Sequence, residues 1–322
     1  MSATDLKPAF NKNNIPIFYT SDDNYVDMLS VSILSLVDNS SEENNYDIVI
    51  LEDGINKYSK QILLTILQGK PNISLRFFSV TDFVKKSNSE TWKLPQSLSP
   101  ASYYILFTPL VACNYSKVIY LDCDTLVQTD ISNLLRIDIR NHCCAAALDP
   151  NCDIAADLNV AKHLCDDLGF KDMSNYVNSG IVVFNIQKIN EANIYDKVVD
   201  IAHKNKGYFG DQDVLNAAYD GKIFVLDQLW NVFWGLIFER EKMRNLSDSE
   251  IEHLLDNAYI IHFAGQKPTQ KPNEPYAAKW WMYARRTPFY ERLLHKSLTY
   301  GFKQIFHDSY CSSIQNSWDN LK

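Results

Sequence analysis

The stretch Lys117-Val-Ile-Tyr-Leu-Asp-Cys-Asp124 joins a short apolar segment directly to two carboxylates. Residues 117–121 have the apolar run and polar flanks of a strand that is buried on both faces. Asp122 and Asp124 follow at its end, two positions apart, so both carboxylates can converge on one hard divalent cation. The alternative is an ordinary acidic turn, because a lone Asp-x-Asp arises easily by chance.

Strands and helices alternate on the N-terminal side of this stretch. The predicted strands cover residues 15–20, 46–51 and 73–80. Helices are predicted from about Met28, from Ser59, and over the longer stretch Ser102 to Cys113. This alternation predicts an α/β fold with a mostly parallel sheet between two layers of helices. Ligands of such sheets bind beyond the carboxyl ends of the strands, where chemistry is therefore expected.

The C-terminal side continues the alternation and then changes character. Further strands are predicted at residues 144–148, 180–184, 222–226 and 258–263, with a helix over 194–205. The stretch from Gln266 to Pro275 is rich in Pro and Lys and predicts the end of the main domain. From Tyr276 the chain reads as helical and aromatic. We therefore expect a flexible segment at 1–14, a main domain at 15–271 and a small C-terminal helical extension at 272–322.

Composition and charge narrow the classes of function. The 322 residues are 46% hydrophobic and carry a net charge of −8, without a dense run of Lys or Arg, which argues against nucleic-acid binding. The 7 cysteines lack a C-x-x-C or other zinc-type spacing. The polar segment Met1 to Asn14 lacks a signal-peptide core, and no apolar run reaches membrane length. We expect a cytoplasmic protein, with peripheral contact at the inner face of the cell membrane left open.

A second candidate motif is Ile260-Ile-His-Phe-Ala-Gly-Gln-Lys267, in which a histidine closes an apolar strand. His262 is either a hydrogen-bonded core residue or a third metal ligand. Gly265 would let the backbone approach a phosphate. Lys267 would supply positive charge that this acidic protein otherwise lacks.

Three weaker motifs contain the remaining candidates. Asp22-Asp23-Asn24-Tyr25 follows the first strand, where Asp23 or Asn24 would cap the next helix and the loop would contact a nucleotide. Asn178 precedes a predicted strand and is otherwise a turn residue. Asp211 and Gln212 begin a predicted helix, where an acidic residue also suits the helix dipole.

Together, these five motifs in this order resemble glycosyltransferase family eight, over about Ile15 to Lys271. The family includes bacterial lipopolysaccharide galactosyl- and glucosyltransferases and glycogenins. The resemblance implies a Rossmann-like GT-A catalytic domain, a mixed and mostly parallel sheet, a UDP-sugar donor, Mn²⁺ or Mg²⁺, and retention of anomeric configuration.

The resemblance also implies roles for individual residues. The implied metal ligands are Asp122, Asp124 and His262. The implied donor-binding residues are Thr20, Asp22, Asn24, Tyr25, Cys123, Gly265 and Lys267. Asn178 matches a residue near the donor sugar, Asp211 matches a contact to sugar hydroxyls, and Gln212 matches the residue under the anomeric carbon.

Two positions depart from the family pattern. Ile105, in Tyr103-Tyr104-Ile105-Leu106, stands where the family often has Arg, so a charge that binds or orients the donor is missing. The phosphate segment usually has Lys-Pro-Trp six residues after the histidine. Here Lys267 comes one residue early, and Lys271 provides a competing register.

The resemblance therefore implies a retaining hexosyltransferase that moves glucose or galactose from a UDP-sugar to a saccharide, lipid-linked or protein-linked glycan. The alternatives are a catalytically idle nucleotide-sugar-binding protein, a sugar nucleotidyltransferase, and self-glycosylation on one of the 18 Tyr. Trp280-Trp281-Met282-Tyr283 would contact the acceptor or a membrane surface, or would pack on the core, which we favour. A homo-oligomer is left open.

Overall fold

A seven-stranded sheet forms the centre of the fold, in the order β3-β2-β1-β4-β7-β6-β8. The computed structural model describes residues 6–82, 103–149, 159–205, 209–233, 247–265, 267–272 and 275–319. The large sheet consists of β1 (Asn14–Asp22), β2 (Asn45–Asp53), β3 (Ile73–Ser79), β4 (Lys117–Leu121), β6 (Cys144–Leu148), β7 (Val177–Asn185) and β8 (Ile223–Leu226). A second, three-stranded sheet consists of β5 (Thr125–Val127), β10 (Ile260–His262) and β9 (Val232–Phe233).

One strand of the large sheet runs against its neighbours. β1 pairs in parallel with both β2 and β4, β2 with β3, and β6 with β8, whereas β7 is antiparallel to β4 and β6. The sheet is therefore mixed and mostly parallel, as expected. The carboxyl ends of β1 and β4 and the amino end of β7 consequently meet at one edge of the sheet.

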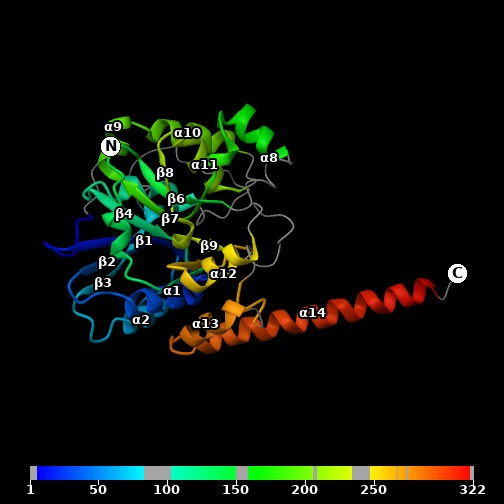
Figure 1. The fold of residues 1–322 in the computed structure, drawn as a ribbon. Helices are drawn as coiled ribbons and strands as arrows, with labels where there is room; N and C mark the ends of the chain where they lie inside the picture. The colour runs from blue at the N-terminus through cyan, green and yellow to red at the C-terminus, as the bar shows by residue number, and fades with distance from the viewer. Residues whose placement is uncertain are drawn as a thin grey trace.

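Helices cover both faces of the sheet (Figure 1). The longer ones are α1 (Val26–Asp38), α2 (Lys57–Thr65), α9 (Ile186–Ala192), α10 (Tyr195–Lys204), α11 (Asp211–Ala218), α12 (Asp248–Asn257), α13 (Pro275–Ala284) and α14 (Tyr290–Asp319). Short helical turns are η2 (Tyr104–Phe107), α5 (Thr108–Val111), α6 (Ser132–Arg136), α8 (Asn159–Lys162), the π-helical η3 (His163–Asp167), η4 (Met173–Asn175) and η5 (Gln228–Trp230).

Two apolar cores lie on opposite faces of the large sheet. Ile17 and Tyr19 of β1 belong to one cluster of buried side chains and Phe18 to the other, as the period of two along a strand requires. All three are fully buried. Burying one such side chain stabilises the fold by roughly 1.5–3 kcal/mol.

Three local predictions were wrong. The stretch predicted as one helix over Ser102 to Cys113 is, from Tyr103 on, the 3-10 turn η2 followed by α5. Pro109 lies in the first turn of α5. Proline has no N–H for a hydrogen bond four residues back, so one continuous helix cannot form.

The other two errors concern element boundaries. The N-cap of α1 is Tyr25, without a side-chain cap, because the carboxylate of Asp23 accepts instead from the backbone N–H of Asn56 at 3.2 Å. The strand predicted to begin at Gly180 begins at Val177, which pairs with Leu148 of β6.

The C-terminal region is helical, as predicted. Trp280 of α13 is fully buried and belongs to the same core as β1 and α1, in agreement with the interpretation of this aromatic segment as core packing. α14 extends far beyond the rest of the molecule in Figure 1. Among the described residues, no helix has the length and apolar character that a membrane span requires.

Candidate metal and donor site

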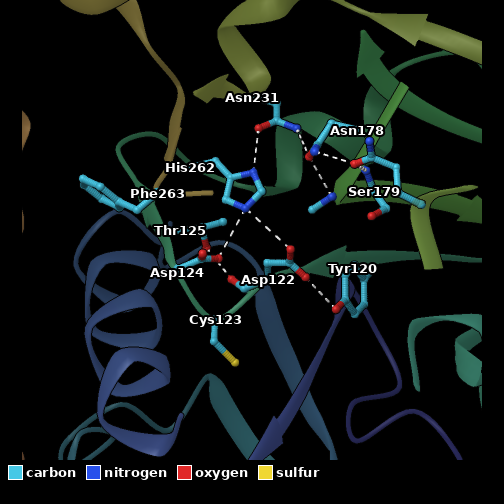
Figure 2. A network of polar contacts seen from close by, with 12 residues as sticks. Tyr120, Asp122, Cys123, Asp124, Thr125, Asn178, Ser179, Asn231, His262 and Phe263 are labelled. Carbon is cyan, nitrogen blue, oxygen red and sulfur yellow. Dashed lines mark hydrogen bonds and ion pairs between the residues drawn. The ribbon is translucent and has the colours of Figure 1, made fainter. Parts of the chain in front are cut away.

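Two carboxylates and one imidazole converge at the edge where β4 ends. Nε2 of His262 lies 3.5 Å from Oδ2 of Asp122 and 3.3 Å from Oδ1 of Asp124. Figure 2 shows the imidazole pointing between the two carboxylates. The small sheet brings them together, because β10 pairs with β5 so that His262 faces Thr125, and the N–H of Phe263 donates to the carbonyl of Asp124 at 2.9 Å.

This set of donors fits a divalent metal ion. One ligand atom from each of Asp122, Asp124 and His262 lies within 4.8 Å of the others, and Asp124 and His262 are buried. Carboxylate oxygens suit Mg²⁺ and Mn²⁺, whereas an imidazole ligand is more typical of transition metals, so the mixed set matches Mn²⁺ well.

In the metal-free protein two cationic side chains lie against the carboxylate of Asp124. Burial opposes ionisation of Asp124, but the ammonium of Lys267 and the imidazole of His262 outweigh it and hold the pKa of Asp124 far below its usual value. Burial alone would lower the pKa of His262, yet the carboxylates of Asp124 and Asp122 raise that pKa to about 9. In the metal-free protein the carboxylate of Asp124 is thus ionised and the imidazole of His262 carries a proton at neutral pH.

An amide chain connects the cluster to the second group of candidates. Nδ1 of His262 donates to Oδ1 of Asn231 at 3.1 Å, and Nδ2 of Asn231 donates to Oδ1 of Asn178 at 2.9 Å (Figure 2). Nδ2 of Asn178 in turn donates to Oε1 of Gln212 at 2.6 Å. This connection orients the imidazole so that Nε2 faces the carboxylates, the arrangement a metal-binding histidine needs.

The start of α11 contributes Asp211 and Gln212. Nε2 of Gln212 donates to Oδ2 of Asp149 at 2.7 Å, and its Oε1 accepts from the N–H of Ser179 at 3.2 Å, so the whole amide is fixed. Asp211 accepts from the hydroxyl of Ser179 at 2.9 Å. Burial, together with the nearby charge of Asp122, raises the pKa of Asp211 to about 8.

Thr20 at the end of β1 connects to the candidate metal ligands through Tyr120 and Cys123. Thr20 and the hydroxyl of Tyr120 are 2.9 Å apart, and Tyr120 donates to Oδ1 of Asp122 at 2.7 Å. The thiol of Cys123 donates to the carbonyl of Thr20 at 2.9 Å, and burial raises the pKa of that thiol. Thr20 and Cys123 therefore lie beside the carboxylates.

The loop after β1 comes next to the cluster because β1 and β4 are neighbours. The carboxylate of Asp22 accepts from the backbone N–H of Asn24 at 2.9 Å and of Tyr25 at 3.1 Å, which forms a tight turn. The side chain of Tyr25 is 49% exposed and therefore available to a ligand.

The phosphate segment presents one of its two lysines to the cluster. Nζ of Lys267 forms an ion pair with Asp124 and donates to the carbonyl of Phe263 at 3.0 Å, whereas Lys271 is exposed on the next turn. Gly265 has a φ of +79°, a backbone conformation that favours glycine.

Ile105 is fully buried in an apolar cluster, so that position contributes no charge.

Sequence reasoning missed several residues of this network. Asp149 comes directly after β6, so the rule that polar residues after strands carry chemistry could have found it. Tyr120 lies within a strand, and Asn231 lies between a helical turn and β9. Neither of these two carries a signal in the sequence, because only the sheet pairing brings them to the site.

Comparison with known proteins identifies the family of this chain. The model of the family described as "Glycosyl transferase family 8" matches residues 16–272, which include every candidate site residue. The chain belongs to this family. As in other family 8 proteins, its fold is of the GT-A type, and the expected resemblance is confirmed.

Individual relatives of this family 8 chain cover different shares of it. A Haemophilus influenzae protein is 29% identical over 220 residues, 67% of this chain and 62% of its own length. The lipopolysaccharide 1,2-glucosyltransferase of Escherichia coli is 25% identical over 261 residues, 79% of this chain and 72% of its own. The bifunctional glycosyltransferase WbbM has a TM-score of 0.82 at 25% identity, covering 90% of this chain but only 53% of WbbM.

Proposed function

We propose that this protein is a metal-dependent retaining hexosyltransferase that takes glucose or galactose from a UDP-sugar. The observation that carries the proposal is the continuous chain of contacts from Asp122, Asp124 and His262 through Asn231 and Asn178 to Gln212. It joins a cation site to a fixed amide at the carboxyl edge of the sheet, where ligands of α/β folds bind.

In this proposal Asp122, Asp124 and His262 hold Mn²⁺ or Mg²⁺. When bound, the cation acts as a Lewis acid that neutralises charge on the diphosphate leaving group. Lys267, which already lies at Asp124, adds a second positive charge there, and Gly265 lets the backbone come close to the phosphates. The proposed nucleotide-binding residues are Thr20, Asp22, Asn24, Tyr25 and Cys123.

The residues near the donor sugar favour attack on the same face. The amide of Gln212 is neutral and held on both sides, by Asn178 and by Asp149, so it is a poor nucleophile that can stabilise an oxocarbenium-like centre by its position. Asp211 is the alternative nucleophile, since a carboxylate can do that work. Burial and the charge of Asp122 raise its pKa to about 8, so it is mostly protonated at neutral pH in the metal-free protein.

The acceptor in this proposal is a saccharide or a lipid- or protein-linked glycan. A relative named for glucosyl transfer to lipopolysaccharide supports this class and makes glucose the first donor to test. We assign catalysis to residues 15–271 and treat 272–322 as the C-terminal extension.

A binding and turnover experiment tests the proposal. Purified protein is heated with UDP-glucose, UDP-galactose or UDP, in Mn²⁺ or in EDTA, and UDP release is measured with saccharide acceptors. A ligand that binds only the folded state raises the melting temperature, and we expect that rise in Mn²⁺ but not in EDTA. Asp124→Asn should abolish it, whereas Asp138→Asn, at an exposed carboxylate paired with Arg140, should not.

The outcomes separate the alternatives. Metal-dependent binding without UDP release under any acceptor would favour the idle binding protein, for which the buried Ile105 is the structural argument. Unchanged metal-dependent turnover in Asp124→Asn would contradict the assigned metal site. Added hexoses on the protein, seen by intact-mass analysis, would indicate self-glycosylation.

A further inference from the structure

The first two turns of α14 contact the backbone of the proposed nucleotide loop. Nη2 of Arg292 donates to the carbonyl of Asp23, and Nζ of Lys296 donates to the carbonyl of Asn24 at 2.6 Å. Two adjacent peptide groups of the loop after β1 are therefore held by cations that lie 269 and 272 residues later in the chain. Both cations lie beyond residues 16–272, the range that the family model matches.

The same two cations also meet a buried carboxylate at the start of α1. The side chain of Asp27 is fully buried, and its Oδ2 lies 3.2 Å from Nε of Arg292 and 2.6 Å from Nζ of Lys296. Both contacts of Oδ2 are ion pairs, and neither has the geometry of a hydrogen bond. A buried carboxylate is strongly unfavourable without a compensating charge, so Asp27 fixes the position of α14 against α1.

The loop is consequently held by three sets of hydrogen bonds. Asp22 accepts from the N–H groups of Asn24 and Tyr25 within the loop, and Asp23 accepts from Asn56 at the start of α2. Arg292 and Lys296 hold the two carbonyls from α14. The end of β1, from which the loop leaves, lies beside β4, with Tyr19 opposite Leu121 just before the metal cluster.

We propose that Arg292 and Lys296 are positioning residues that pre-order the loop at Asp22 to Tyr25 for the nucleotide of the donor. The inference rests on the proposed function, because it assumes that this loop binds the nucleotide. A loop that is already ordered does not have to be ordered at binding, which strengthens the binding of its ligand. The C-terminal extension is then part of the donor site, although neither cation needs to touch the donor.

Single substitutions with a matched control test this inference. Arg292→Met and Lys296→Met each remove one cation and leave the other beside Asp27. Arg286→Met is the control. Arg286 forms an ion pair with Asp38, so it also connects the C-terminal extension to α1. Asp38 is the last residue of α1, whereas the loop precedes the first residue of that helix. The readouts are the Kd of UDP in Mn²⁺ by calorimetry, and KM and kcat for the donor.

We expect the Kd of UDP and the KM of the donor to rise on the order of tenfold in Arg292→Met and Lys296→Met, the loss that matches ordering about one residue. We expect kcat to change little, and Arg286→Met to bind UDP like the wild type. Lys296→Arg, which keeps a charged donor, should restore most of the affinity. Faster amide hydrogen exchange at residues 22–28 in the two methionine variants, and not in the control, would accompany the loss.

The results distinguish failure of the inference from failure of the proposed function. Wild-type protein that does not bind UDP in Mn²⁺ would overturn the proposed function, and the inference with it. Wild-type binding with an unchanged Kd in Lys296→Met would overturn the inference alone, as would an equal loss in Arg286→Met. Lys296→Met suffices if Arg292→Met does not fold, since it removes the donor to Asn24 while Arg292 still compensates Asp27.

Discussion

The imidazole of His262 lies directly against the backbone of Gly180. A Cβ at position 180 would be 2.1 Å from Cε1, 2.7 Å from Nδ1 and 2.9 Å from Nε2 of His262. Real Cβ atoms do not approach other atoms so closely, and glycine within a strand often marks such a close approach. The third candidate metal ligand therefore owes its position to the missing side chain of a residue on the neighbouring large sheet.

Gly180→Ala should displace the imidazole from the two carboxylates. Changes that disturb the orientation of a metal ligand typically weaken metal affinity by about 10- to 100-fold, and we expect a loss of that size for Mn²⁺. Calorimetric titration with Mn²⁺ measures it. Gly301→Ala in α14, where an added Cβ meets nothing within 4 Å, is the control and should bind Mn²⁺ normally. Equal Mn²⁺ affinity in the two variants would show that His262 is not held in this way.

Asn231 should matter in two separable ways. Asn231→Ala removes both its acceptor for His262 and its donor to Asn178, so Mn²⁺ affinity should fall by about 10- to 100-fold. Asn231→Asp keeps the acceptor but loses the donor, so Mn²⁺ affinity should be retained while kcat falls through Asn178. Calorimetry and donor turnover measure the two effects. A variant Asn231→Asp that loses metal but keeps kcat would contradict this division.

The fold could be predicted largely because its strands are apolar runs that end in polar clusters. Lys117 to Leu121 and the carboxylates after it identified the strand and the edge of the sheet at which the site forms. The helix expected over Ser102 to Cys113 could not be corrected from periodicity alone, because its apolar spacing is helical and only Pro109 interrupts it. Local pattern thus gave the element types better than their continuity.

The site was predictable only where its residues directly follow strands. Asn231 joins His262 to Asn178 through the pairing of β9 with β10, which no local spacing encodes. The two lysine registers after His262 were likewise equivalent in sequence. The turn after Gly265 separates them, since the N–H of Lys271 donates to the carbonyl of Lys267 and its side chain stays exposed.

The pKa of His262 predicts how the metal-free protein responds to pH. A pKa raised from its ordinary value of 6.5 to about 9 stabilises the folded state fully below pH 6.5, and this contribution is lost as pH rises through about 9. The pKa of Asp211 is also raised, to about 8, so the stability of the folded state also decreases as Asp211 loses its proton with rising pH. The melting temperature in EDTA should therefore fall between about pH 6.5 and pH 9.

Binding of Mn²⁺ should release a proton in the same pH range. A histidine ligand must be neutral, so at pH 7.5 the imidazolium has to lose its proton, and the apparent affinity for Mn²⁺ should rise with pH up to about 9. Calorimetry in two buffers of different ionisation enthalpy counts the protons, and we expect about one. Titration heats that do not depend on the buffer would mean that His262 is already neutral or does not bind the metal.

Lys267 and Lys271 form a matched pair for the last prediction. The ammonium of Lys267 lies at Asp124, where its charge opposes a second cation, so Lys267→Met should not weaken the binding of Mn²⁺ alone. If Lys267 supports the diphosphate, the same change should lower kcat/KM for the donor by about 10²- to 10³-fold, the usual effect of removing one electrostatic contact to a leaving group or oxyanion. Lys271→Met should stay within about twofold of the wild type, because that side chain is exposed. The opposite order of the two variants would assign the phosphate contact to Lys271 and require the segment after Gly265 to rearrange when the donor binds.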